Sequence, residues 1–272
     1  MIAILQSTNV SHCVKNVIAR LLAAIFALSL TFLHIYIAFN QRLLKEYSPK
    51  VFIMRIPRFY IPCAMSIQQT SKLPDDAGQH LARVLRMKCD QQVTLFNGQG
   101  GQYLATIIDI TRHKVTVKID SFSDPDLESP LDLTLIQCIS RGDRMDYTIQ
   151  KSVELGVNTI QPVFSQRGVV KLDEKRAVKK FEHWQKVAIS ACEQSGRNII
   201  PAVLNPIKIT DALKLNSDNN NLKILMHTND ESTQPYQLDS VAKNLRSCVL
   251  MAGPEGGLTE EEVTLAQQQG FK

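Results

Sequence analysis

Residues 248–257, Cys-Val-Leu-Met-Ala-Gly-Pro-Glu-Gly-Gly, place a glycine-rich turn directly after an apolar run. The apolar run predicts a buried strand, and Thr259 with Glu262 forms the pattern of a capping box at the start of a helix. Three glycines allow the backbone of the turn to approach a ligand closely, and Pro254 restricts its shape. The turn is therefore predicted to bind a ligand through its backbone; the alternative is a tight strand-to-helix connection without a ligand.

The surrounding residues 131–272 alternate between apolar runs and helical patterns, which predicts an α/β domain with a mostly parallel sheet. Asp143 is predicted to cap the first helix, Gly156 to end it, and Val178 and Trp184 to share the buried face of the second. The expected strands cover residues 131–139, 157–164, 199–203, 222–227 and 248–252, and the expected helices residues 143–155, 173–194 and 238–245. Because open parallel sheets bind ligands at the carboxyl ends of their strands, the site is expected there.

Residues 54–125 have a different pattern, in which short β-type runs are separated by turn residues such as Asn97-Gly98. This pattern predicts an antiparallel meander through residues 92–96, 103–110 and 115–119. Before it, Asp75 is expected to cap a short helix over residues 79–86. Residues 121–130 are acidic and contain proline, which indicates a linker.

The basic residues of this front part could hold phosphate groups, although charged residues on a solvated helix face are the commoner case. Four arginines are the candidates for RNA binding: Arg55, Arg58, Arg83 and Arg86. The formal net charge of the chain is +5. Most of this charge lies in residues 1–53, and the rest divides into a mildly basic front and a mildly acidic back. Any polyanion is therefore expected to bind the front part.

Residues 1–53 form an apolar leader, in which residues 21–39 are almost unbroken in their apolar character. Nineteen residues just suffice to span a bilayer, so a membrane anchor is one interpretation. We favour another, in which translation starts at Met54 and the upstream residues are not normally made. A soluble helix is the third. Membrane association is expected only if residues 21–39 are an anchor.

Several classes of enzyme are disfavoured by the motifs that the sequence lacks. It has no GxGxxG after a predicted strand, no GxxxxGK[ST], no HExxH and no GxSxG. The six cysteines form no CxxC pair, so no metal site is expected, and scattered thiols are typical of a cytoplasmic protein.

Five blocks of sequence, in order, resemble the bacterial RsmE family, the 16S ribosomal RNA uridine-N3 methyltransferases of the SPOUT class. The blocks are MRIPR (residues 54–58), HLARVLR (80–86), SRGDRMDYTIQKSVELG (140–156), EQSGR (193–197) and GPEGG (253–257). The resemblance extends over residues 54–272. It implies a two-domain α+β protein, with a small PUA-like RNA-binding β-barrel over residues 54–125 and a SPOUT domain over residues 131–272 that ties a trefoil knot.

The resemblance also implies that the protein binds S-adenosylmethionine, forms a homodimer and acts on 16S rRNA in the small ribosomal subunit. The expected cofactor contacts are Leu225, Met226, His227, Gly253, Pro254, Glu255, Gly256 and Gly257. Thr228 stands where many relatives have proline, so the loop after residues 225–227 departs from the family pattern.

The methylation of uridine N3 requires an accessible Watson–Crick edge and removal of the N3 proton. The resemblance assigns this chemistry to Arg141, Glu154, Glu193 and Arg197. We expect the two arginines to hold RNA phosphate or the uracil oxygens, and the two glutamates to fix them by charge-assisted hydrogen bonds. An ordinary helix pair with Lys151 is the alternative for Glu154.

Relatives continue beyond the helix that follows GPEGG, whereas this sequence ends at Lys272. This predicts a C-terminally truncated SPOUT domain with an incomplete knot, a strand at residues 248–252 that lacks a neighbour, poor stability, and weak or absent cofactor binding. The alternative is that the intact gene continues past this end. The alternative functions are a catalytically impaired RNA-binding relic of the enzyme and, from the leader alone, a membrane-tethered protein.

Overall fold

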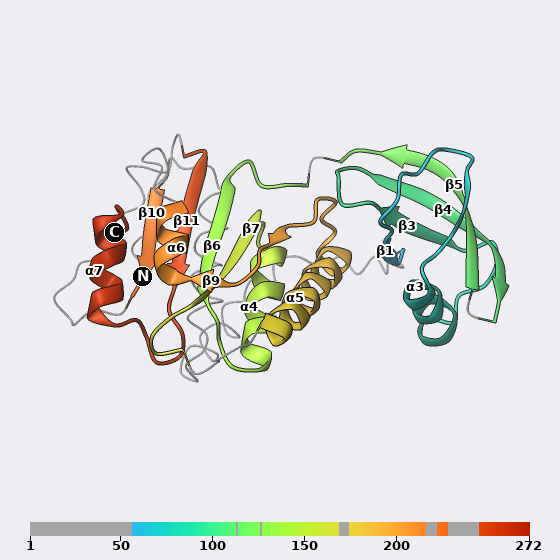
Figure 1. Cartoon of the computed structure of the whole chain (residues 1–272). Coiled ribbons are helices and arrows are strands. Elements are labelled where there is room, and N and C mark those ends of the chain that lie inside the picture. The colour runs from blue at the N-terminus through green and yellow to red at the C-terminus, as the bar shows by residue number, and fades with distance from the viewer. Residues whose placement is uncertain (1–55, 113, 126, 169–173, 216–221, 228–244) are drawn as a thin grey trace, which may run out of the picture. The chain divides into compact units, whose positions relative to one another are not determined.

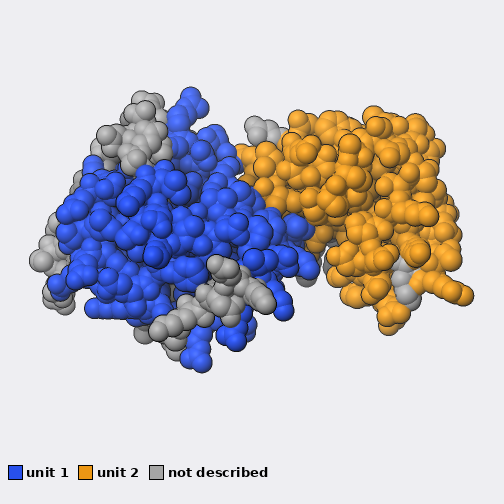
Figure 2. Space-filling view, viewed as in Figure 1, with its two compact units in different colours: residues 1–36, 129–191, 201–272 blue, residues 37–128, 192–200 orange. Residues whose placement is uncertain are grey.

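A computed structural model describes residues 56–112, 114–125, 127–168, 174–215, 222–227 and 245–272 of the chain (Figure 1). The described residues form two compact units, which Figure 2 shows in different colours. The N-terminal unit comprises residues 56–128 and 192–200, and the C-terminal unit comprises residues 129–191 and 201–272. One boundary in the sequence therefore does not separate the units, because residues 192–200 belong to the first.

The N-terminal unit contains a five-stranded sheet in the order β1-β3-β4-β5-β2. Its strands are β1 (Arg58–Tyr60), β2 (Thr70–Lys72), β3 (Gln92–Phe96), β4 (Gln102–Thr111) and β5 (Lys114–Ser123). The antiparallel pairing of β3, β4 and β5 confirms the predicted meander. Alternate residues of these strands, such as Val93, Ile107 and Val117, are fully buried in one apolar cluster. The described pairings make an open path from β1 to β2, in the unit for which the resemblance implied a PUA-like β-barrel.

The helical segment of this unit differs from the prediction. It begins with α3 (Asp75–Gln79) and continues as the π-helical turn η2 (His80–Val84). Pro74 occupies the N-cap position, so Asp75 lies in the first turn instead of capping the helix. Leu81 anchors the segment by complete burial. The segment ends at Val84, two residues before the predicted end, and Arg86 then adopts the left-handed conformation with φ 52°.

The C-terminal unit is built on a six-stranded sheet in which every pairing is parallel, as predicted. The strands are β6 (Asp132–Cys138), β7 (Thr159–Phe164), β8 (Ala202–Val203), β9 (Ile207–Lys208), β10 (Leu222–Met226) and β11 (Ser247–Ala252). The order is β10-β11-β6-β7-β8, and β9 also pairs with β7. Leu250 of β11 lies opposite Ile224 on one side and Leu135 on the other. The expectation that this strand lacks a neighbour was wrong.

Among the described residues, four helices belong wholly or mainly to this unit: α4 (Asp143–Glu154), α5 (Glu174–Ser195), α6 (Ile209–Leu215) and α7 (Glu260–Gln268). Helices α6 and α7 pack with Ile136, Val163 and Met251 of the sheet in one apolar cluster. Because side chains alternate along a strand, Leu133 and Leu135 of β6 are buried on the other face.

The ends and faces of α4 and α5 test three further predictions. Gly156 has φ 98° directly after α4, as its predicted role at the end of the helix requires. Asp143 does not cap α4, because the N-cap position is Gly142 with φ 59° and Asp143 lies in the first turn. On α5, Trp184 is buried as predicted, whereas Val178 is 52% exposed.

The apolar leader and most of the helix predicted over residues 238–245 lie outside the described residues. Within the part of the chain that the structure describes, no helix is long and apolar enough to cross a membrane.

Candidate functional site

The strand order of the C-terminal unit creates a point at which the connections diverge. The chain leaves β6 toward β7 and β8 on one side, and it returns through β10 and β11 on the other side. The loops that follow β6 and β11 are therefore neighbours at the carboxyl edge of the sheet. In open parallel sheets, this divergence leaves a crevice in which ligands bind.

The glycine loop, residues 253–257, follows β11 at this point. Gly257 has φ +70°, a conformation that L side chains rarely adopt, and its N–H donates to the Pro254 carbonyl at 2.9 Å. At Gly253, an added Cβ would lie 3.1 Å from Leu258 Cγ. Glycine is thus favoured at residue 257 by the backbone conformation, and at residue 253 the loop packs closely against Leu258.

Glu255 connects the glycine loop to the loop that follows β6. Its Oε1 accepts a hydrogen bond from the Arg141 backbone N–H at 3.1 Å and forms an ion pair with Arg144 at 3.3 Å. Burial raises the pKa of the Glu255 carboxyl, but hydrogen bonds from its own and the Arg141 backbone, together with Arg144, outweigh this and lower it below its ordinary value. Arg141 and Arg144 are exposed, so this pair lies at the surface.

The loop that follows β7 holds the glycine loop from another direction. Arg167 donates to the carbonyls of Gly256 at 3.3 Å and Leu258 at 3.2 Å. The backbone N–H of Gln166 donates to Glu262 at 2.7 Å. Sequence reasoning missed both Arg167 and this role of Glu262. The position of Arg167 just beyond the carboxyl end of a parallel strand was the signal that could have indicated it.

Helix α7 begins immediately after the glycine loop. The Thr259 side chain accepts from the Glu262 N–H at 3.2 Å, and the Glu262 carboxylate accepts from the Thr259 N–H at 2.9 Å. This reciprocal pair confirms the predicted capping box. It fixes the first turn of α7 and hence the exit of the loop.

Leu225, Met226 and His227 lie beside the glycine loop, at the end of β10. Met226 is opposite Ala252 in the parallel register, so the chain turns into residues 227 and 253 at the same edge of the sheet. All three residues are partly exposed. The structure therefore brings both groups of predicted cofactor-binding residues together, with Arg141 nearby through Glu255.

Glu154 lies away from this edge. It is the last residue of α4, whereas Arg141 precedes that helix, and at 1.5 Å per residue the helix separates them by about 18 Å. Its carboxylate binds Lys151 Nζ at 2.8 Å and accepts from Gln150. Glu154 was expected to fix one of the two predicted arginines, whereas the contact found is the alternative, a helix pair with Lys151.

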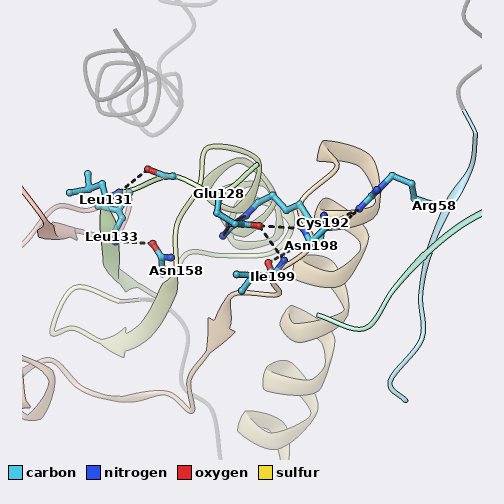
Figure 3. A network of polar contacts seen from close by, with 10 residues as sticks. Arg58, Glu128, Leu131, Leu133, Asn158, Cys192, Asn198 and Ile199 are labelled. Atoms are coloured by element: carbon cyan, nitrogen blue, oxygen red, sulfur yellow. Dashed lines mark hydrogen bonds and ion pairs between the residues drawn. The ribbon is translucent and has the colours of Figure 1, made fainter. Parts of the chain in front are cut away.

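In the N-terminal unit, Arg58 is part of the fold (Figure 3). Its guanidinium donates to Asn198 Oδ1 at 2.8 Å and to the Arg197 carbonyl at 3.3 Å, and it also binds the Gln102 side chain. It lies 5.0 Å from the centroid of the Phe96 ring. These contacts join β1, β3 and β4 to residues 197–198. Arg58 was predicted to bind RNA phosphate, whereas its guanidinium is engaged within the fold.

Arg197 is only 5% exposed, and its partner is a residue that sequence reasoning missed. Its Nε and Nη2 donate to Glu128 Oε2 at 2.9 and 2.7 Å. The other carboxylate oxygen accepts from the backbone of Asn198 and Ile199 (Figure 3). Glu128 lies in the predicted linker, where nothing indicated a buried ion pair. The side chain of Arg197 therefore supports the fold of this unit.

Glu193 also secures residues 192–200. Its Oε1 accepts from the Tyr60 backbone N–H at 3.0 Å. Burial raises the pKa of the Glu193 carboxyl above its ordinary value, and the Tyr60 hydrogen bond opposes this only in part. Glu193 was expected to fix an arginine, whereas the contact observed is with the backbone of β1.

Two of the remaining predicted RNA-binding arginines lie around η2. Arg83 belongs to that turn and Arg86 follows it, and both are exposed. Arg55 lies outside the described residues.

Comparison with known proteins identifies the family. A model of the RNA methyltransferase domain matches residues 127–272, and a model of the RNA methyltransferase PUA domain matches residues 73–120. The Ribosomal RNA small subunit methyltransferase E of Buchnera aphidicola subsp. Acyrthosiphon pisum is 34% identical over 219 residues, which cover 80% of this chain and 84% of the relative. The chain belongs to the RsmE family.

Other RsmE proteins support this assignment. The Bacillus subtilis protein is 29% identical over 205 residues, which cover 74% of this chain and 80% of that relative. The Ribosomal RNA small subunit methyltransferase E of Neisseria gonorrhoeae, whose crystal structure was solved bound to S-adenosyl methionine, is 43% identical in sequence. Its structure matches with a TM-score of 0.73, and the match covers 80% of this chain and 88% of that one. The predicted RsmE resemblance and its PUA-like plus α/β architecture are thereby confirmed.

Proposed function

We propose that this protein transfers a methyl group from S-adenosylmethionine to N3 of a uridine in the 16S rRNA of the small ribosomal subunit. The observation that carries the proposal is the glycine loop, which lies at the divergence point of a parallel sheet in a member of the RsmE family. The methyl-donor-bound structure of the Neisseria relative supports the choice of cofactor.

The residues around the loop fit a methyl donor bound through the backbone. Cβ atoms are absent from three of five positions, and Leu258 already fills the space beside Gly253. Leu225, Met226 and His227 offer further backbone groups at the adjacent strand end. When bound, S-adenosylmethionine supplies an electrophilic methyl group on a sulfonium ion. In this proposal the protein residues hold that group in place and present the uridine to it.

Arg141 and Arg144 are the cations that we assign to the RNA near this loop. Both are exposed, and Glu255 holds the Arg141 backbone and the Arg144 guanidinium. A phosphate or a uracil oxygen could accept from them in bidentate fashion. Glu154 has no part in this step, because it lies at the far end of α4.

The N-terminal unit is assigned to the recognition of RNA outside the reacting base. Arg83 and Arg86 are its exposed candidates, and Arg55 joins them from the sequence alone. Arg58, Glu193 and Arg197 act indirectly in this scheme, because they hold residues 192–200 in the unit. We further propose that the enzyme acts in the cytoplasm as a homodimer.

The proposal is tested by incubating the full chain with methyl-labelled S-adenosylmethionine and small ribosomal subunits from cells that lack their own RsmE. We expect one labelled uridine in 16S rRNA, which mass spectrometry of nuclease fragments identifies as 3-methyluridine. Label on another atom or base would contradict the assigned specificity. RNA binding without label would instead favour the RNA-binding relic.

A further inference from the structure

Glu262 makes more contacts than its capping box requires. It is 3% exposed, and its two carboxylate oxygens accept from backbone N–H groups of separate segments. Oε2 accepts from Thr259 at 2.9 Å, within the box, and Oε1 accepts from Gln166 at 2.7 Å, beyond the end of β7. A capping box satisfies only its own helix terminus. The bond to Gln166 therefore joins α7 to a segment 96 residues earlier in the chain.

Arg167 adds to this connection, and it too donates from the β7 side. Its guanidinium donates to the carbonyls of Gly256 and Leu258, so two backbone groups within or next to the glycine loop are held from the β7 side. Gln166 adds a side-chain bond to Glu261 at 3.2 Å. We call Gln166, Arg167 and Glu262 the brace. In the brace, the β7 segment donates and the α7 segment accepts.

The brace contacts the loop through the Gly256 carbonyl. None of its hydrogen bonds uses the N–H group of Gly253, Glu255 or Gly256. Arg167 lies close to both remaining glycines: an ideal Cβ on Gly256 would be 3.6 Å from Arg167 Cβ, and one on Gly257 would be 3.9 Å from Arg167 Nη1. A loop that is rich in glycine loses much conformational entropy when a ligand orders it. Bonds that order the loop beforehand reduce this loss and increase affinity.

We propose that Glu262 and Arg167 are positioning residues that hold the glycine loop in its ligand-binding conformation. The inference rests on the proposed function, because it takes the loop as the seat of the methyl donor. It adds that affinity for the donor depends on Arg167, which contacts the loop from the segment after β7, and on Glu262, which joins that segment to Thr259 just beyond the loop. Neither residue contacts the reacting atoms in this scheme.

The first test compares Glu262→Gln with two matched variants of the full chain. The amide that replaces the Glu262 carboxylate has a single acceptor oxygen, so it can satisfy only one of the two N–H donors. Either the hydrogen bond from Thr259 or the one from Gln166 is then lost. Thr259→Ala removes the hydroxyl half of the box and keeps both Glu262 bonds. Glu260→Gln makes the same charge change at an exposed position in the same turn.

Calorimetric titration with S-adenosylmethionine is expected to show about tenfold weaker binding for Glu262→Gln, as loss of one charge-assisted hydrogen bond implies. Thr259→Ala is expected to melt at a lower temperature but to bind S-adenosylmethionine within about threefold of the wild type. Glu260→Gln is expected to match the wild type in both melting temperature and affinity. If Glu262→Gln only melts earlier and binds as tightly as Thr259→Ala, Glu262 is a helix cap and the inference is overturned.

Arg167→Ala provides a second test, because Arg167 is exposed and its loss should not prevent folding. We expect a higher KM for the methyl donor, by about fivefold, with a kcat close to that of the wild type, since the lost contact positions the loop equally in the ground and transition states. Arg167→Lys should restore part of the KM. An unchanged KM in Arg167→Ala would contradict the proposal.

Hydrogen exchange separates this inference from the proposed function. Without any cofactor, the amides of Gly256 and Gly257 should exchange faster in Glu262→Gln than in Glu260→Gln. If the wild type fails to bind the donor but this difference is seen, the brace is real and the proposed function is wrong. Equal exchange in the two variants would refute the brace itself.

Discussion

The two units use arginines from the family blocks in opposite ways. In the C-terminal unit, Arg144 is paired with Glu255 at the surface, with side-chain exposures of 56% and 26%. In the N-terminal unit, Arg197 is paired with Glu128, with exposures of 6% and 20%. A surface pair contributes little to stability and can exchange its partner, whereas a buried pair cannot lose one member without leaving a desolvated charge.

This difference indicates separate duties for the same residue type. Arg141 and Arg144 are placed where an RNA phosphate could replace or join Glu255. Arg197 and Arg58 keep residues 192–200 in the N-terminal unit, so their effect on RNA binding is indirect. Substitution experiments should therefore separate the two pairs by stability, by salt dependence and by pH.

The largest effect is expected for Arg197→Ala, which leaves the Glu128 carboxylate without its cation. Loss of one partner of such a pair costs about 3 kcal/mol, or roughly a hundredfold in the population of locally opened molecules. Cys192 reports on this opening, since it is buried in the same unit and burial raises the pKa of its thiol to about 12. We expect its alkylation to accelerate by about that factor.

The control for this prediction is the C-terminal unit of the same variant. Burial also raises the pKa values of the Cys138 and Cys248 thiols to about 12, and these cysteines should stay protected. Arg144→Ala should leave all three thiols protected. The comparison between the units breaks down if Cys192 reacts no faster in Arg197→Ala than in Arg144→Ala.

An intermediate effect is expected for the double variant Arg141→Ala/Arg144→Ala. RNA affinity should fall about tenfold and the salt dependence of binding should weaken, because phosphate contacts release counterions. Stability in urea should change by less than about 1 kcal/mol. Arg246→Ala, at the amino edge of the sheet, is the matched control. Filter binding of a 16S rRNA fragment at several salt concentrations measures both the affinity and its salt dependence.

The smallest effect concerns the pH dependence of stability. The pKa of Glu193 is raised in the folded protein. Its contribution to the free energy of unfolding is therefore present below pH 4.5, the ordinary pKa of a glutamate, and is lost as pH rises through the folded-state pKa. Glu255 has a lowered pKa, so its contribution is present above 4.5 and is lost as pH falls through the folded-state value. Relative to the wild type, Glu193→Gln should gain stability with rising pH and Glu255→Gln should gain it with falling pH. Urea unfolding between pH 3 and 7 that gave the same sign for both would contradict these environments.

Features that depend on neighbouring residues were predictable from the sequence. The capping box of Thr259 and Glu262, the meander of β3 to β5 and the end of α4 at Gly156 all follow from local patterns. The cofactor-binding candidates of β10 and the glycine loop also came together, because strand ends in a parallel sheet share an edge.

Features that depend on distant partners were not predictable. The insertion of β11 between β10 and β6 is a matter of strand order, which periodicity does not encode. Glu128 had the composition of a linker residue until the fold brought it to Arg197. Residues 207–215 form β9 and α6, which at two and seven residues are too short for their periodicity to stand out.

The central claim is that the glycine loop seats the methyl donor, and calorimetric titration of the full chain with S-adenosylmethionine tests it most directly. Gly257→Ala forces a side chain onto a backbone with φ +70°, and Gly100→Ala does the same at φ +104° in open space of the other unit. Each substitution should lower stability by about 1–2 kcal/mol. We predict one binding site in the wild type and in Gly100→Ala, and affinity reduced at least tenfold in Gly257→Ala. Equal affinity in all three proteins, or no binding by the wild type, would contradict the account.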